Sequence, residues 1–162
     1  MAQAKYPEDV AQRVYDILDA NRTALGIPDK GLYYGDQDKI PVTPTYCVEP
    51  GPSTKELAGA LYQVEVQFEL YVMVYHSPVK EIQTTQKEVQ LLASAVEELF
   101  HLSYLRLQPP QNPGSQLPAD QFVVQGHFVG NDPGYTAKNN GLTLMRAVRL
   151  TWQGKSKIRL GA

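Results

Sequence analysis

The chain has 162 residues, of which 43% are hydrophobic and 20% charged, so it is long enough and apolar enough to fold around a core. Fifteen basic and seventeen acidic residues leave a formal net charge of −2, which excludes a general electrostatic attraction to nucleic acid. The single cysteine excludes an intrachain disulfide, and no apolar run approaches the roughly 20 residues that span a bilayer.

The N-terminal part predicts a helix followed by irregular structure. Residues 1–162 are expected to form one domain made in a reducing cytosol, since no apolar signal-peptide run begins the chain. A helix is predicted over residues 7–24, because Pro and two acids suit a helix start and apolar residues then recur at helical spacing. Gly26 ends it. Prolines further on predict loops with two extended pieces, residues 39–42 and 45–49.

The longest regular pattern covers residues 61–76, which contain no Gly or Pro. Apolar residues at even positions and polar ones at odd positions predict a β-strand with one face in a core. Strands rarely exceed about ten residues, so we expect this strand to extend beyond its own core and to be covered there by a partner. On the second face, Tyr71, Met73 and Tyr75 replace the polar series, which indicates that protein covers this end.

The remaining elements complete the fold. A second amphipathic helix is predicted over residues 79–102, and a proline-rich loop or arm over residues 108–120. Two more strands, residues 122–129 and 142–153, flank a turn predicted at residues 131–134, and a short basic tail follows at residues 155–162. The order predicts an α+β fold with a mostly antiparallel sheet, one unusually long strand and two main helices packed on it.

Residues with enzymatic chemistry are dispersed. His76, His101 and His127 fit no metal-binding spacing, and no nucleophile motif or phosphate-binding loop is present. Cys47 has no flanking pattern of a reactive thiol and is typical of a small core residue. We therefore predict no catalysis, no metal and no cofactor.

The candidate functional surface is the polar face of the long strand, which we interpret as a lumen or an interface. Arg146 and Arg149 of the last strand are expected to pair with its carboxylates, within or between subunits, if the two strands are neighbours. Unrelated surface charges are the open alternative. The polar residues of this face are Gln63, Glu65, Gln67 and Glu69.

The element order, with QVEVQFELYVMVYHS before a helix and then NDPGY and LMRAVRLTW, resembles tail terminator (tail-completion or neck) proteins of long-tailed bacteriophages. The resemblance implies a virion protein at the head-tail junction, assembled in the host cytoplasm. It implies a homo-oligomeric ring of six subunits that caps the tail tube and joins it to neck or adaptor proteins, and to the sheath where the tail has one. DNA would pass through the ring without specific binding. An acidic lumen that repels phosphates would suit this role.

Three alternatives stay open at this point. The chain could be an adaptor or stopper of the same neck. It could instead be a small cytosolic ligand-binding protein or enzyme, with a pocket near His127, Arg146 and Tyr135. A nucleic-acid binder would need a continuous basic face, whereas the basic residues here are dispersed except at the C-terminus. Residues 108–120 and 155–162 are candidate arms onto neighbouring rings.

Overall fold

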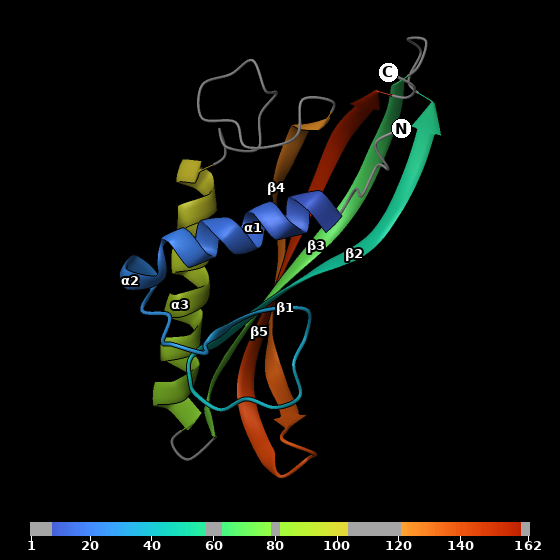
Figure 1. The fold of residues 1–162 in the computed structure, drawn as a ribbon. Helices are drawn as coiled ribbons and strands as arrows, with labels where there is room; N and C mark the ends of the chain where they lie inside the picture. Colours follow the sequence, from blue (N-terminus) through green and yellow to red (C-terminus); the bar gives the residue numbers. More distant parts are fainter. Residues whose placement is uncertain (1–7, 58–62, 79–81, 104–120, 160–162) are drawn as a thin grey trace.

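A computed structural model describes residues 8–57, 63–78, 82–103 and 121–159 (Figure 1). Its strands form a sheet in the order β1-β2-β3-β5-β4, in which β1 and β2 are parallel and the other neighbours antiparallel. The expected α+β fold with a mostly antiparallel sheet is confirmed. The elements are α1 (Glu8–Ala20), α2 (Arg22–Leu25), β1 (Leu32–Tyr34), β2 (Thr45–Leu57), β3 (Gln63–Pro78), α3 (Ile82–Ser103), β4 (Gln121–Lys138) and β5 (Thr143–Arg159).

Both main helices lie on the same face of the sheet (Figure 1). Helix α1 packs on β1 and β2, while α3 packs on β3, β5 and β4. Even-numbered residues of β3 point toward the helices, as the alternation predicts. The main core joins these residues to the apolar stripes of both helices, which is what holds the two layers together. Its fully buried members include Val10, Ile17, Leu18, Val66, Leu70, Val74, Val89, Val148 and Leu150.

The long strand β3 lies in the middle of the sheet. Neighbours from the same chain pair with it nearly throughout, β2 on one side and β5 on the other. Its 16 residues therefore need no partner subunit to satisfy their backbone hydrogen bonds. The expectation that a partner covers the strand where it leaves the core is wrong for its backbone edges, because β5 pairs with residues 63–78 of β3 and β2 pairs with residues 64–75.

The end of β3 that was expected to be covered is covered by the chain itself. Residues 35–44, which we call the strap, join β1 to β2 and contribute Ile40 to a second apolar cluster on the face away from the helices. Residues 39–42 lie in the strap and form no strand. The cluster also contains Cys47, Met73, Tyr75 and Met145, each at most 6% exposed.

The predicted turn at residues 131–134 is wrong, because these residues continue β4. Strand β4 is an edge strand, so Pro133, which has no backbone N–H to donate, is tolerated there at little cost. The hairpin turns instead at Asn139, Asn140 and Gly141, whose φ angles are 57°, 57° and 78°. The Asn-Gly pair is a strong hairpin signal that the prediction passed over.

Three other boundaries differ from expectation. The first helix is interrupted at Asn21, whose side chain donates a hydrogen bond to the Ile17 carbonyl at the end of α1, and α2 then stops at Gly26 as expected. Strand β5 runs to Arg159, so most of the predicted basic tail is sheet. The proline-rich residues 108–120 and residues 160–162 lie outside the described parts of the chain.

Candidate functional site: the uncovered face of the sheet

The face of the sheet away from α1 and α3 carries the predicted polar row. The register sets Glu65, Gln67 and Glu69 opposite Lys157, Lys155 and Gln153 of β5. On the other side, Glu56 and Thr54 of β2 lie opposite Glu65 and Gln67. Gln63, at the start of β3, lies opposite Arg159 in the same register. Glu65, Gln67 and Glu69 thus share one side of one strand.

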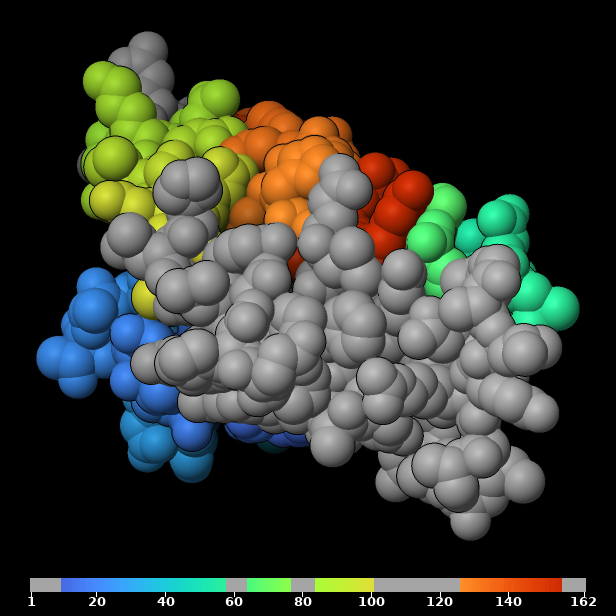
Figure 2. Space-filling model, turned by 90° about the horizontal axis from the view of Figure 1, so that it is seen from above, coloured from blue at the N-terminus to red at the C-terminus, as the bar shows by residue number. Residues whose placement is uncertain are grey.

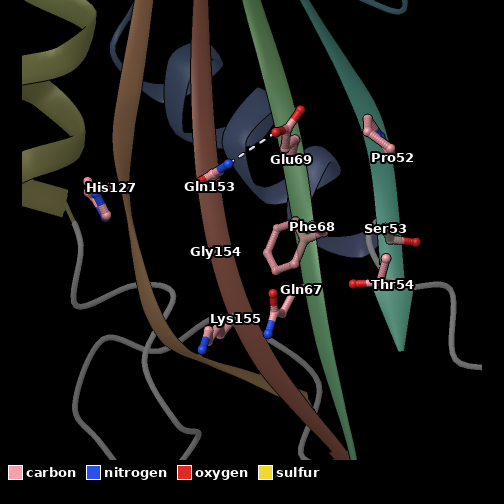
Figure 3. Close-up of a pocket in the computed structure, with 10 residues that line it drawn as sticks. All are labelled: Pro52, Ser53, Thr54, Gln67, Phe68, Glu69, His127, Gln153, Gly154 and Lys155. Carbon is pink, nitrogen blue, oxygen red and sulfur yellow. Dashed lines mark hydrogen bonds between the residues drawn. The ribbon is translucent and has the colours of Figure 1, made fainter. Parts of the chain in front are cut away.

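Glu69 is the carboxylate of the polar row that accepts two hydrogen bonds. Its Oε2 accepts a hydrogen bond of 3.0 Å from the Tyr71 hydroxyl. Its Oε1 accepts one of 3.1 Å from Nε2 of Gln153, which Figure 3 shows as a dashed line. Burial, together with the hydrogen bond to Glu69, raises the pKa of the Tyr71 phenol. Three side chains from β3 and β5 therefore hold one another in place across the sheet.

The face is polar but not uniformly acidic. Lys155 Nζ lies 3.9 Å from Glu65 Oε1, in a pair that is substantially exposed and contributes little to stability. Glu56 of β2 stands directly opposite Glu65 of β3, so two negative charges face each other across neighbouring strands. The acidic row of β3 therefore has the exposed cation of Lys155 beside it on β5. A general repulsion of phosphates, expected from β3 alone, is weakened by this neighbour.

The register does not bring Arg146 or Arg149 to Glu65 or Glu69 within the chain. Arg149 lies opposite Met73, with its guanidinium 5.1 Å from the centre of the Tyr71 ring and 3.5 Å from Asp132. It is exposed, so its pairing with another subunit stays a prediction.

Arg146 lies on the helix-covered face. It stands opposite His76 and is only 5% exposed, with its guanidinium 3.9 Å from the centre of the Tyr135 ring. Its Nε is buried without a hydrogen-bond partner. His76 itself lies 3.1 Å from a carboxylate oxygen of Glu88 on α3. At 5% exposure, Arg146 presents little surface to another subunit, and its pairing between subunits stays a prediction.

A shallow hollow of about 290 Å³ lies on the uncovered face (Figure 3). His127 of β4 lines it, whereas Arg146 and Tyr135 lie on the other face, so the pocket expected for an enzyme is not assembled. The hollow offers amide, hydroxyl, carboxylate and amine groups, which suit binding of polar groups. It is lined by Pro52, Ser53, Thr54, Gln67, Phe68, Glu69, His127, Gln153, Gly154 and Lys155.

Metal and thiol chemistry find no support in the described residues. Across residues 8–57, 63–78, 82–103 and 121–159, no three His, Cys, Asp or Glu side chains gather closely enough to bind a metal ion. Burial raises the pKa of the Cys47 thiol to about 11, which leaves it protonated and weakly nucleophilic at neutral pH. None of the helices in these ranges combines the length and apolarity needed to cross a membrane.

The partners of the acidic row were missed at the level of sequence. Gln153, Lys155 and Lys157 follow Trp152 at alternate positions, which is the signal of a strand that continues. Gln153 is the last residue of the predicted strand, whereas Lys155 and Lys157, which β5 in fact includes, fall in the predicted basic tail. The strap was missed because nothing local distinguishes a loop that folds over a sheet from one that points into water.

No protein-family model and no curated protein matches this sequence. Among solved structures, a chain of the virion of a native gene transfer agent particle has a similar fold, with a TM-score of 0.51 and 15% sequence identity. The match covers 89% of this chain and 91% of that one. At this identity the likeness concerns the fold, and it extends over nearly the whole of both chains.

Proposed function

We propose that this protein is a structural component of a phage-like virion, a ring at the head-tail junction that caps the tail tube and joins it to the neck. The observation that carries the proposal is the fold shared over nearly the full length with a chain of a gene transfer agent virion. The element order had independently suggested tail terminators.

The arrangement of the described residues suits a binding role. Glu69 is engaged by two hydrogen bonds, Cys47 is fully buried, and His127 and Arg146 lie on opposite faces. A broad polar face of this kind suits contact with other macromolecules.

The sheet edges favour ring contacts through side chains rather than through a continuous sheet. Beyond Val48, β2 has no strand on its outer side among the described residues, and this stretch carries Pro50, Pro52 and a bulge. The opposite edge strand β4 carries Pro133 and two irregularities in its ladder. Such features discourage strand addition. Neighbouring subunits would then meet through faces and helices, and the subunit would stay soluble before assembly.

The proposed mechanism is steric. A closed ring of about six copies, the number that the resemblance implies, has a fixed surface on each side. One surface matches the end of the tail tube and leaves no site for another tube subunit, and the other receives the neck. The uncovered face of the sheet is placed on the lumen, where its mixed charges give DNA no strong binding site.

Tube growth tests the proposal. Purified tube protein of the same phage is allowed to polymerise with and without this protein, and tube length is measured by negative-stain microscopy. The proposal predicts shorter tubes carrying a ring at one end. Tubes of unchanged length with bare ends would contradict capping, whereas rings bound to isolated neck components alone would favour an adaptor or stopper.

A further inference from the structure

The strap covers the second apolar cluster, which lies on the face of the sheet away from α1 and α3. Ile40 is 7% exposed and is the strap residue in this second cluster. The backbone of Gln37 forms a hydrogen bond with the side chain of Cys47 beneath it. In Figure 1 the strap is the long loop between β1 and β2 that runs toward the β4–β5 hairpin. The apolar contact between the strap and the sheet is therefore made mainly by Ile40.

A carboxylate pins the first half of the strap. Asp36 Oδ1 accepts hydrogen bonds from the Tyr75 hydroxyl at 2.5 Å and from Nζ of Lys138 at 2.9 Å. The Lys138 side chain is only 7% exposed and its Nζ lies 4.5 Å from the centre of the Tyr75 ring, whereas the Asp36 side chain is 42% exposed. The Asp36 carboxylate is thus partly exposed to water and pairs with the buried ammonium group of Lys138.

Hydrogen bonds to the hairpin turn hold the second half. The backbone N–H of Asn139 donates to the Asp38 carbonyl at 2.8 Å, and that of Asn140 donates to the Asp38 carboxylate at 2.9 Å. The N–H of Ile40 donates to Oδ1 of Asn139 at 2.9 Å. Strap and turn are therefore fastened by polar contacts that water can replace.

The strap starts at a residue suited to act as a hinge. Gly35 has a φ of 89°, and a Cβ built on it meets no atom within 4 Å. Its N–H donates to the Val48 carbonyl at 2.7 Å, which fixes the hinge to β2. A change of backbone angle at this position can lift the strap and leave β1 and β2 paired.

From these contacts we propose that the strap is a latch, pinned by Asp36 and hinged at Gly35, which opens as a unit while the sheet stays folded. Opening exposes Cys47, Met73 and Tyr75 as an apolar surface at the end of the polar face. The proposal stands on the strap's own contacts and does not depend on the function proposed above.

The thiol of Cys47 reports latch opening, because it is the chain's only thiol and lies under the strap. The rate of its reaction with an aromatic disulfide reagent is measured across low urea concentrations. Local opening exposes little surface, so the rate should be nearly independent of urea until global unfolding takes over. A rate that rises steeply from zero urea, with the slope of global unfolding, would overturn the proposal.

Substitutions then identify the pin. Asp36→Asn should raise the urea-independent rate at least tenfold, and Ile40→Ala should raise it as well, while the slope of global unfolding is unchanged. Asp29→Asn, which replaces an exposed acid outside the strap, is the matched control and should leave the rate unchanged. If Asp36→Asn and Ile40→Ala both label at the wild-type rate in the urea-independent range, the strap is not a latch.

Discussion

The indole ring of Trp152 lies directly over Gly126 of the neighbouring strand β4. A Cβ at Gly126 would collide with ring atoms of Trp152, and a Cβ at Gly154 would lie 2.5 Å from Cζ3 of the same ring. Trp152 is 4% exposed and packs at 5.6 Å, centroid to centroid, against Phe68. Because Gly126 and Gly154 have no side chains, they leave the space that the indole ring of Trp152 fills.

Replacing Gly126 by Ala should therefore destabilise the fold by about 1–3 kcal/mol, the usual cost of overpacking a rigid core. Gly134→Ala is the control, since a Cβ at Gly134 in the same strand meets no atom within 4 Å. Urea unfolding followed by Trp fluorescence measures both. Equal stabilities of the two variants would show that the ring moves aside without cost.

The hairpin turn allows a paired test of a side-chain contact. Asn139 and Asn140 both have a φ of 57°, in the left-handed region, which Asn adopts more readily than Ala does. Replacement by Ala therefore costs similar backbone strain at either position. Only at position 139 does Ala also remove two side-chain hydrogen bonds, one accepted from the Ile40 N–H and a longer one, of 3.3 Å, donated to the Thr143 hydroxyl. Asn139→Ala should be less stable than Asn140→Ala by about 1 kcal/mol in urea unfolding. The reverse order would show that the fold gains nothing from the two hydrogen bonds of the Asn139 side chain.

Alkaline pH should weaken the fold through Cys47. The thiol's pKa is raised from 9.0 to about 11 in the folded state, because burial disfavours the thiolate. The unfolded chain loses this proton near pH 9 and the folded chain only near pH 11. The stabilisation is therefore complete below pH 9 and is lost as the pH rises toward 11.

Cys47→Ala removes this titration, so the stability difference between wild type and variant should shrink by about 2–3 kcal/mol between pH 9 and 11. The free energies of unfolding are compared at each pH under reducing conditions, and groups common to both proteins, including Tyr46, cancel in the difference. A constant difference across this range would mean that the folded protein admits the thiolate.

The placement of the uncovered face in the assembled ring can be tested with bulky labels. In a Cys47→Ala background, Gln67→Cys puts a thiol on an exposed position of the polar face, and Leu91→Cys puts one on the exposed side of α3. Labelled with a gold-cluster maleimide, the first should appear inside the ring and the second outside it in electron micrographs. Gold from position 67 on the outer rim would instead make this face an outer surface.

Sequence reasoning succeeded where a periodic pattern was long. The alternation from Gln63 onward identified β3 and its buried face, and the spacing of apolar residues found α1 and α3. It failed where tertiary position decides the outcome. Pro133 reads as a turn residue, yet it lies in an edge strand that tolerates it, and Gly154 reads as a strand end, yet it makes room for Trp152.

The candidate surface was predictable by residue but not by partner. Glu65 and Glu69 could be assigned to one face of a strand, whereas their neighbours depend on a register that no local pattern fixes. In that register Glu69 lies opposite Gln153, and Arg146 lies on the opposite face of the sheet, beside His76. The strap and its contact with the hairpin turn join residues about one hundred positions apart, which lies beyond any local signal.

Figure 2 views the molecule from above, with the described strands β4, β5, β3 and β2 following one another across it. In the proposed ring, copies of this broad subunit close around a central hole. The most direct measurement is the mass of the purified protein by size-exclusion chromatography with light scattering, followed by negative-stain imaging. The account predicts closed rings of about six subunits, under closed cyclic symmetry. A strict monomer at every concentration, with or without tail tubes, would contradict it.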